Sequence, residues 1–185
     1  MKRNEISAKA HANAVEHGFW KERNSNEHCL MLVCTEISEL VEADRKDNRA
    51  DKIGYDTAIA NAHGGVVRDD WFKYAFNKCI KGTLEEEFAD IAIRLADLAG
   101  ALGVDFDKMQ PCRYYRAFDR FSFTENAFAL IKGISKDRIA IEKRIQFAFG
   151  FIEEWAKYEG VDLDVFIDLK MKYNTSREVL HGKKY

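Results

Sequence analysis

The chain has 185 residues, of which 46% are hydrophobic and 12% aromatic, and its 29 basic and 31 acidic residues give a formal net charge of −2. This much apolar material argues against a disordered chain, and the near balance of charges argues against a general basic surface for nucleic-acid polymers. The chain has no run of about 18 apolar residues and no apolar segment of the signal-peptide type near Met1. We therefore expect neither a nucleic-acid polymer nor a membrane as a partner.

The four cysteines fit a reducing compartment. Cys29, Cys34, Cys79 and Cys112 form no CxxC pair, the spacing typical of a zinc site or a redox motif. We predict reduced, partly buried thiols and a cytoplasmic location.

Helical periodicity dominates the chain. It has one proline and eleven glycines, and strict alternation of apolar and polar residues is rare, which argues against a β-rich fold. Apolar residues instead recur at steps of three and four, as amphipathic helices require. We predict an all-α protein, with one antiparallel helical bundle spanning residues 1–185. Its five or six main helices are expected at residues 5–18, 27–47, 84–103, 124–134, 138–159 and 163–179.

Local signals mark the breaks between these helices. Thr83 followed by Glu86 predicts a capping box at the start of the third helix, and Gly103 and Gly160 predict helix ends. The segment 48–82 contains several glycines and an aromatic run. We predict that it is an insertion or lid with one or two short helices.

Two pairs of acidic residues lie on either side of that segment. Glu36 and Glu39 are three residues apart, as are Glu87 and Asp90, and residues with this spacing share a helix face. Both pairs flank apolar stripes, so antiparallel packing of the two helices would bring four carboxylates together. Such a set of oxygen ligands suits Mg²⁺ or Mn²⁺. Burial of several like charges is unfavourable without a cation or protons, which favours a metal there.

Two other interpretations of these acids remain open at this point. Acids three residues apart are common on solvated helix faces, and Arg94, Asp97 and Glu42 continue polar stripes as surface residues would. On spacing alone, a metal site and a solvated surface are about equally compatible with the sequence. A di-iron bundle would require Glu-x-x-His on two helices. Neither Glu36 nor Glu87 has a histidine three residues later, so that interpretation is weak.

The segments around these acids resemble a known family. Residues 35–40 (TEISEL) and 86–91 (EEFADI) are similar to the two signature segments of the MazG-like nucleotide pyrophosphohydrolases, which belong to the all-α NTP pyrophosphatase superfamily. Further similarity to a MazG-like subgroup lies at residues 18–20 (GFW), 43–46 (ADRK), 170–177 (KMKYNTSR) and 181–184 (HGKK).

The resemblance implies Mg²⁺-dependent hydrolysis of nucleoside or deoxynucleoside triphosphates to the monophosphate and pyrophosphate, in nucleotide-pool housecleaning. It also implies a homodimer or a dimer of dimers. The metal ligands and catalytic residues that it implies are Glu36, Glu39, Glu87 and Asp90.

Substrate contacts are implied on the last helix. The family's lysine, asparagine and arginine correspond to Lys170 or Lys172, Asn174 and Arg177. Without the family, an exposed basic helix end is the preferred explanation of this face, and with the family the two explanations are comparable. Trp20 is a further candidate for contact with a base. Its neighbour Phe19 is expected in the core, because aromatic residues at a helix end usually pack there.

The chain departs from the family pattern at two places. Thr35 occupies a position that is often glutamate, and the gap between Glu39 and Glu87 is longer than usual. The longer gap leaves substrate choice and oligomeric form open. The alternative functions are a catalytically silent nucleotide-binding or regulatory helical protein, and a structural bundle whose acids face solvent.

Overall fold

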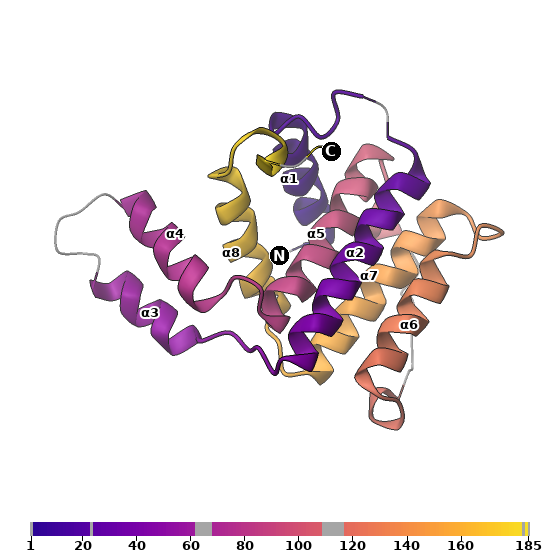
Figure 1. Cartoon of the computed structure of the whole chain (residues 1–185). Helices are drawn as coiled ribbons and strands as arrows, with labels where there is room; N and C mark the ends of the chain where they lie inside the picture. Colours follow the sequence, from indigo (N-terminus) through magenta and orange to yellow (C-terminus); the bar gives the residue numbers. More distant parts are fainter. Residues whose placement is uncertain (1, 23, 62–67, 109–116, 183, 185) are drawn as a thin grey trace.

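The structure is a computed structural model that describes residues 2–22, 24–61, 68–108, 117–182 and 184. The regular secondary structure of these residues is helical throughout, as predicted, and includes no strand. The predicted insertion contributes two helices. The α-helices of the described residues are α1 (Arg3–Glu16), α2 (Asn26–Arg45), α3 (Lys52–Asn61), α4 (Arg68–Cys79), α5 (Leu84–Ala101), α6 (Phe123–Ile134), α7 (Ile141–Tyr158) and α8 (Leu163–Thr175) (Figure 1).

The local signals for helix ends are largely present in the structure. Gly103 follows α5 with φ +65° and Gly160 follows α7 with φ +75°, so both take the left-handed conformation that ends helices. At the start of α5, Thr83 Oγ1 accepts a hydrogen bond from the backbone N–H of Glu86. The predicted capping box is only half formed, because the Glu86 carboxylate accepts from the N–H of Gly82 instead of Thr83.

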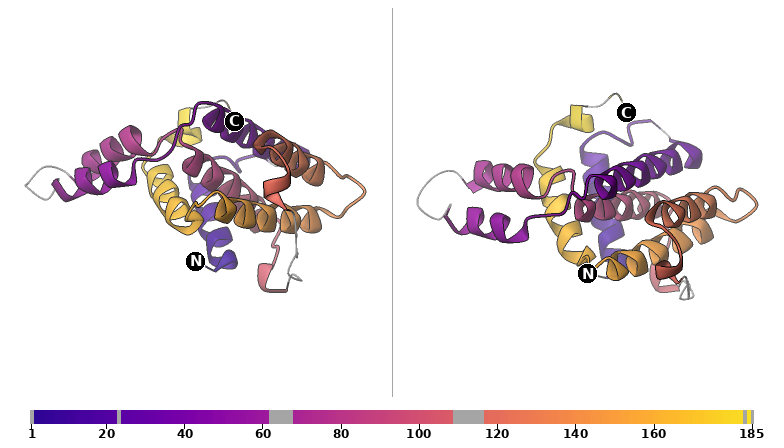
Figure 2. Two further views of the ribbon diagram at one scale, coloured as in Figure 1. Left: turned by 90° about the horizontal axis from the view of Figure 1, so that it is seen from below. Right: turned by 60° about the horizontal axis from the view of Figure 1, so that its bottom comes forward.

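Helix α5 is the centre of the fold. It is buried along most of its length, and α1, α2, α7 and α8 all pack against it (Figures 1 and 2). The N–H of Leu84 donates to the carbonyl of Asn48 at 2.9 Å, which places the end of α2 beside the start of α5. The two helices that carry the predicted acidic pairs therefore run antiparallel.

An aromatic cluster anchors α7 against α5. Trp155 is fully buried, and its ring centroid lies 5.2 Å from that of Phe88 and 4.6 Å from that of Phe123. Burial of large apolar side chains contributes roughly 1.5–3 kcal/mol each. Because Phe88 follows Glu87 directly, this cluster also fixes the helix turn on which that acid lies.

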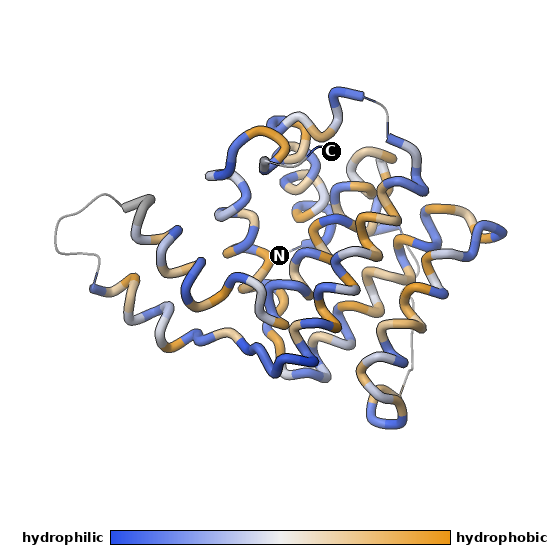
Figure 3. The backbone as a smooth tube through the Cα atoms, in the orientation of Figure 1, coloured by the Kyte–Doolittle hydropathy of each residue, from blue (hydrophilic) through white to orange (hydrophobic). Residues whose placement is uncertain are grey.

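The described residues of the segment 48–82, which are 48–61 and 68–82, form an arm. Helices α3 and α4 pack against each other and project from the rest of the chain (Figure 2). The Phe76 ring stacks on Tyr173 at 4.3 Å, which attaches α4 to α8. The connection between α2 and α3 is strongly hydrophilic (Figure 3). No helix among the described residues is both long and apolar enough to cross a membrane.

Candidate functional site

A cavity of about 410 Å³ lies among α1, α2, α5 and α8. Acidic residues of α2 and α5 line one part of it, residues of α8 and the segment that follows line another, and Phe19 and Trp20 line a third. Every predicted site residue except Lys172 lines this cavity. Of the described residues in the arm segment 48–82, Lys81 and Gly82 line it.

Three of the four predicted metal ligands come together on the cavity wall. Glu36 and Glu39 of α2 and Glu87 of α5 each offer a carboxylate oxygen, and these oxygens lie within 4.8 Å of one another. Glu36 and Glu87 are only 5% and 6% exposed, whereas Glu39 is exposed. The i, i+3 spacing on α2 and the antiparallel packing of α5 together produce this arrangement.

Glu87 is the unsatisfied member of this group. Its Oε2 atom is buried and has no hydrogen-bond partner in the described structure. Burial, together with the nearby carboxylates of Asp90, Glu86 and Glu39, raises the pKa of Glu87 to about 9. A buried, unpartnered carboxylate among other carboxylates fits a divalent cation, which takes oxygen ligands and offsets their charge.

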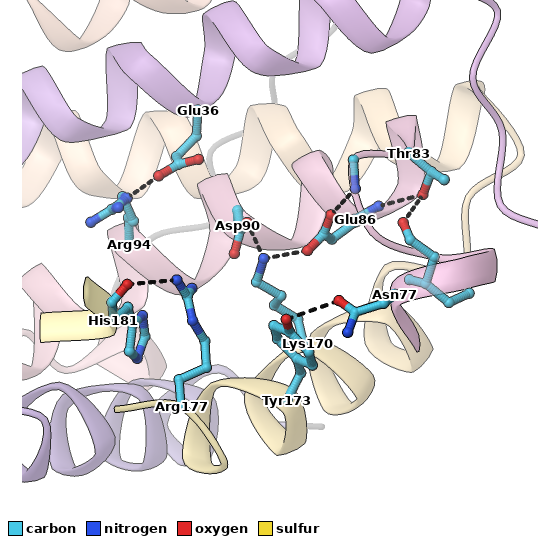
Figure 4. Close-up of polar contacts among 12 residues, drawn as sticks. Glu36, Asn77, Thr83, Glu86, Asp90, Arg94, Lys170, Tyr173, Arg177 and His181 are labelled. Atoms are coloured by element: carbon cyan, nitrogen blue, oxygen red, sulfur yellow. Dashed lines mark hydrogen bonds and ion pairs between the residues drawn. The ribbon is translucent and has the colours of Figure 1, made fainter. Parts of the chain in front are cut away.

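Glu36 is held by a cation of the protein itself. Arg94 of α5 forms an ion pair with Glu36 through its Nε atom (Figure 4). Burial and Asp90 raise the pKa of Glu36, and Arg94 opposes that rise. The solvated-face alternative fits Arg94 poorly, because its side chain is partly buried, pairs with Glu36 and lines the cavity.

Asp90, the fourth predicted ligand, does not belong to this group of three residues, whose carboxylate oxygens lie within 4.8 Å of one another. Its Oδ2 accepts a hydrogen bond from Lys170 Nζ at 2.5 Å, and Lys170 also forms an ion pair with Glu86 (Figure 4). Burial lowers the pKa of Lys170, but the carboxylates of Asp90 and Glu86 outweigh it, and the net shift is upward. Lys170 is therefore a buried, charged partner of two carboxylates on α5.

Glu86 was expected only as a capping residue and not as a member of the site. This residue is 2% exposed, and burial raises its pKa while Lys170 opposes the rise. A signal for it existed, because Glu86 and Asp90 are four residues apart on one helix face. Two acids on one helix face next to an apolar stripe predict a nearby cation. Their spacing does not predict that this cation comes from Lys170, which lies 84 positions from Glu86 in the sequence.

Helix α8 supplies the wall opposite these acids. Lys170, Asn174 and Arg177 line the cavity, as their helical spacing predicted, and Asn174 Oδ1 is buried without a partner in the described structure. Arg177 Nη2 donates to the carbonyl of His181 at 3.1 Å (Figure 4). Lys172 instead is exposed, with its Nζ 4.3 Å from the centre of the Phe72 ring, and does not reach the cavity.

Aromatic residues after α1 close the remaining side. Gly18 has φ +83°, a turn after which Phe19 and Trp20 reach the cavity. Phe19 is thus not a core residue as expected; its ring packs edge-on against His181 at 5.0 Å. Trp20 Nε1 donates to Asp97 Oδ1 at 2.9 Å. Asp97 also lines the cavity and is partly buried, so the solvated-face alternative fits it poorly.

Comparison of this chain with protein families, with curated proteins and with solved structures found no match. Only the geometry of the cavity and the motifs themselves indicate a function for this chain.

Proposed function

We propose that this chain is a Mg²⁺-dependent nucleoside triphosphate pyrophosphohydrolase of the MazG-like type, which converts a nucleoside or deoxynucleoside triphosphate into the monophosphate and pyrophosphate. One observation carries the proposal. Carboxylates from two antiparallel helices meet within 4.8 Å on the wall of a cavity whose other wall presents Lys170 and Arg177. Adjacent acidic and basic walls suit a polyphosphate that binds together with a divalent cation.

The donor set indicates which residues would hold the cation. Glu36, Glu39 and Glu87 offer oxygens at one point, and Asp90 would complete the set on leaving Lys170. Bound there, Mg²⁺ or Mn²⁺ would supply charge neutralisation at phosphate oxygens and a lower pKa for water.

The side chains of the chain itself account for the other requirements of the reaction. Lys170 and Arg177 bind phosphate oxygens, and the arginine fork suits bidentate contact. Trp20 and Phe19 cover the base. Water attacks the α-phosphorus, the new P–O bond forms as the bond to the bridging oxygen breaks, and pyrophosphate leaves. Glu39, the exposed acid of the group, is the carboxylate best placed to accept the water's proton.

The remaining parts of the proposal come from the sequence. A homodimer or a dimer of dimers follows from the family resemblance, and a cytoplasmic location follows from the cysteine pattern. Of the alternatives, a structural bundle with solvent-facing acids fits poorly, because Glu36 and Glu87 are buried. A catalytically silent nucleotide-binding protein is the alternative that the experiment must separate.

The test is pyrophosphate release from a panel of NTPs and dNTPs with Mg²⁺. We expect turnover by the native chain and a loss of more than about a hundredfold in Glu87→Gln and Asp90→Asn, since changes in the outer shell of metal sites already lower activity about ten- to a hundredfold. The matched control is Glu42→Gln, an exposed acid on α2 that is ion-paired with Arg45 and Lys46. It should retain native turnover.

Each other outcome has a definite meaning. Nucleotide binding without any pyrophosphate release would support the silent binding protein. Equal activity of the native chain and Glu87→Gln would exclude the carboxylate group from the reaction.

A further inference from the structure

One of the cations that line the cavity is unpaired in the part of the chain that the structure describes. The described lysines and arginines of the lining are Lys81, Arg94, Lys170 and Arg177. Three of them have partners, because Arg94 and Lys170 form ion pairs with buried acids and Arg177 donates to a backbone carbonyl. Lys81 is exposed and makes no side-chain hydrogen bond or ion pair with any described residue. Its ammonium group is therefore available to a ligand.

The backbone of Lys81 is held in place although its side chain is exposed. The residue lies between the end of α4 and the start of α5, next to Ile80, which is 1% exposed. Its N–H donates to the carbonyl of Phe76 at 2.9 Å, and the carbonyl of Gly82 accepts from Asn48 Nδ2 at 2.7 Å. The fold thus fixes the position of the Lys81 backbone, whereas the flexible four-carbon side chain can move toward a ligand.

Helix α5 sets the order of groups along the cavity. Asp97, which accepts a hydrogen bond from Trp20, follows Glu87 by ten residues on this helix. A rise of 1.5 Å per residue separates their positions by about 15 Å. Lys81 comes before the first turn of α5, so it lies at the end of the cavity away from Trp20. A nucleotide whose base contacts Trp20 therefore extends its phosphates toward Lys81.

The far end of such a nucleotide is where the need for a cation is greatest. The terminal phosphate of a triphosphate carries more negative charge than either inner phosphate. The cations implied by the family resemblance lie on or just after α8, where Lys170 shares its charge with two carboxylates of α5. Arg177 lies toward the other end, beside His181 and hence near Phe19. Lys81 is positioned to supply the additional positive charge.

We propose that Lys81 binds the terminal phosphates of the triphosphate, the part that leaves as pyrophosphate, and that the arm thereby contributes to the substrate site. This inference rests on the proposed function, and it concerns a residue outside the segments that resemble the MazG-like family. The contact is a charge-assisted hydrogen bond from the ammonium group to phosphate oxygens. Because it forms with the bound substrate as well as with the departing pyrophosphate, it strengthens binding more than it accelerates the chemical step.

The experiment measures pyrophosphate release by the native chain, Lys81→Met, Lys81→Arg and the control Lys78→Met. Lys78 is an exposed lysine of α4 that lies 5.7 Å from the centre of the Tyr74 ring and does not line the cavity. Lys81→Met should raise KM for the triphosphate about tenfold with little change in kcat, since it removes one hydrogen bond to a charged group. Lys81→Arg and Lys78→Met should keep KM within about twofold of the native value.

Product inhibition locates the contact on the substrate. Lys81→Met should raise the inhibition constant of pyrophosphate about tenfold and leave that of the nucleoside monophosphate unchanged. An equal change for both products, or a change for the monophosphate alone, would overturn the inference, because Lys81 would then not select the leaving half. Thermal unfolding is the control for folding. Lys81→Met should keep the native Tm, since the side chain is exposed and unpaired among the described residues.

Calorimetric titration with an α,β-imido triphosphate analogue and Mg²⁺ tests binding without turnover. Weaker binding by Lys81→Met, and not by Lys78→Met, would support the inference even if no triphosphate were hydrolysed. Turnover by Lys81→Met with the native KM would overturn the inference and leave the proposed function intact. Failure of the native chain both to bind the analogue and to hydrolyse any triphosphate would overturn both.

Discussion

Two neighbouring acids in the first turn of α5 differ in the partners that the protein gives their carboxylates. Glu86 and Glu87 are 2% and 6% exposed, so both carboxylates lie in the interior. Glu86 has a cation of its own in Lys170 and a further donor in the N–H of Gly82. Glu87 faces Glu36 and Glu39 instead, and its Oε2 has no partner among the described residues.

Glu86 belongs to a complete ion cluster, in which the protein supplies the cation. Glu87 belongs to an incomplete cluster, in which its carboxylate oxygen has no such partner. A buried carboxylate is stable only when a cation, a proton or hydrogen bonds compensate it. The chain itself provides that compensation for Glu86 but not for Glu87, for which the proposed Mg²⁺ would supply it. The following predictions test this division, beginning with the largest expected effect.

Removal of the internal cation should destabilise the fold. Lys170→Met leaves Glu86 buried without its partner, and such a loss typically lowers the free energy of unfolding by about 3–5 kcal/mol. Urea denaturation at neutral pH measures it. Lys172→Met, two residues away on the exposed side of α8, is the matched control and should change stability by less than about 1 kcal/mol. An equally small effect at Lys170 would mean that Glu86 does not depend on it.

The external cation should act through Glu87 and not through Glu86. If Mg²⁺ binds the folded chain, it should raise the free energy of unfolding by about 2.7 kcal/mol at a hundred times its dissociation constant. Glu87→Gln should remove most of this stabilisation, whereas Glu86→Gln should retain most of it. Thermal unfolding with and without Mg²⁺ compares the two variants, which differ by one position. Equal stabilisation of the two variants by Mg²⁺ would show that Glu86 and Glu87 do not differ in their need for an external cation.

Arg94 provides a test within the incomplete cluster. Arg94→Met leaves Glu36 without its ion pair, and we expect a loss of about 1–2 kcal/mol because the pair is partly exposed. Mg²⁺ should restore most of that loss, since Glu36 belongs to the group within 4.8 Å. Arg45→Met, which breaks an exposed pair with Glu42 on α2, should cause a small loss that Mg²⁺ does not restore. A loss at Arg94 that is equally insensitive to Mg²⁺ would contradict the assignment of Glu36.

The smallest effect concerns pH and the other end of the cavity. Burial, together with Arg177, His17, Lys170 and Arg94, lowers the pKa of His181 from 6.5 to about 3. Below pH 6.5 the unfolded chain therefore binds a proton that the folded chain does not bind, so this group lowers the free energy of unfolding as pH falls through that window.

His181→Asn should remove that contribution, and asparagine also tolerates the left-handed backbone of this position, where φ is +51°. Urea titrations between about pH 7 and pH 5 should show a smaller loss of stability than in the native chain. An unchanged slope in His181→Asn would place the histidine in solvent.

The helical framework was predictable because it depends on local periodicity. The expected helix at 84–103 corresponds to α5, Leu84–Ala101, and the one at 163–179 corresponds to α8, Leu163–Thr175. The last turn of the latter was overestimated, because the chain leaves the helix at Ser176 and folds back toward His17. That turn depends on a contact between distant segments, which periodicity does not encode.

The acids were predictable as a set, and their partners were not. Spacing placed Glu36, Glu39 and Glu87 on facing helices, but nothing local indicates that Lys170 pairs with Asp90 or that Arg94 pairs with Glu36. Such pairings depend on how whole helices pack. The same limit explains why the sequence left open a solvent-exposed position for Arg94.

The two ends of the arm are joined by hydrogen bonds. Asn48 Nδ2 donates to the carbonyl of Gly82 at 2.7 Å, and the Asn48 carbonyl accepts from the N–H of Leu84. The segment that contains α3 and α4 therefore begins and ends at residues that are hydrogen-bonded to each other. Its length thus has little effect on the register between α2 and α5. Doubling a closed loop costs only about 0.6 kcal/mol of closure entropy. A change in the length of the arm should therefore leave the carboxylates in their positions.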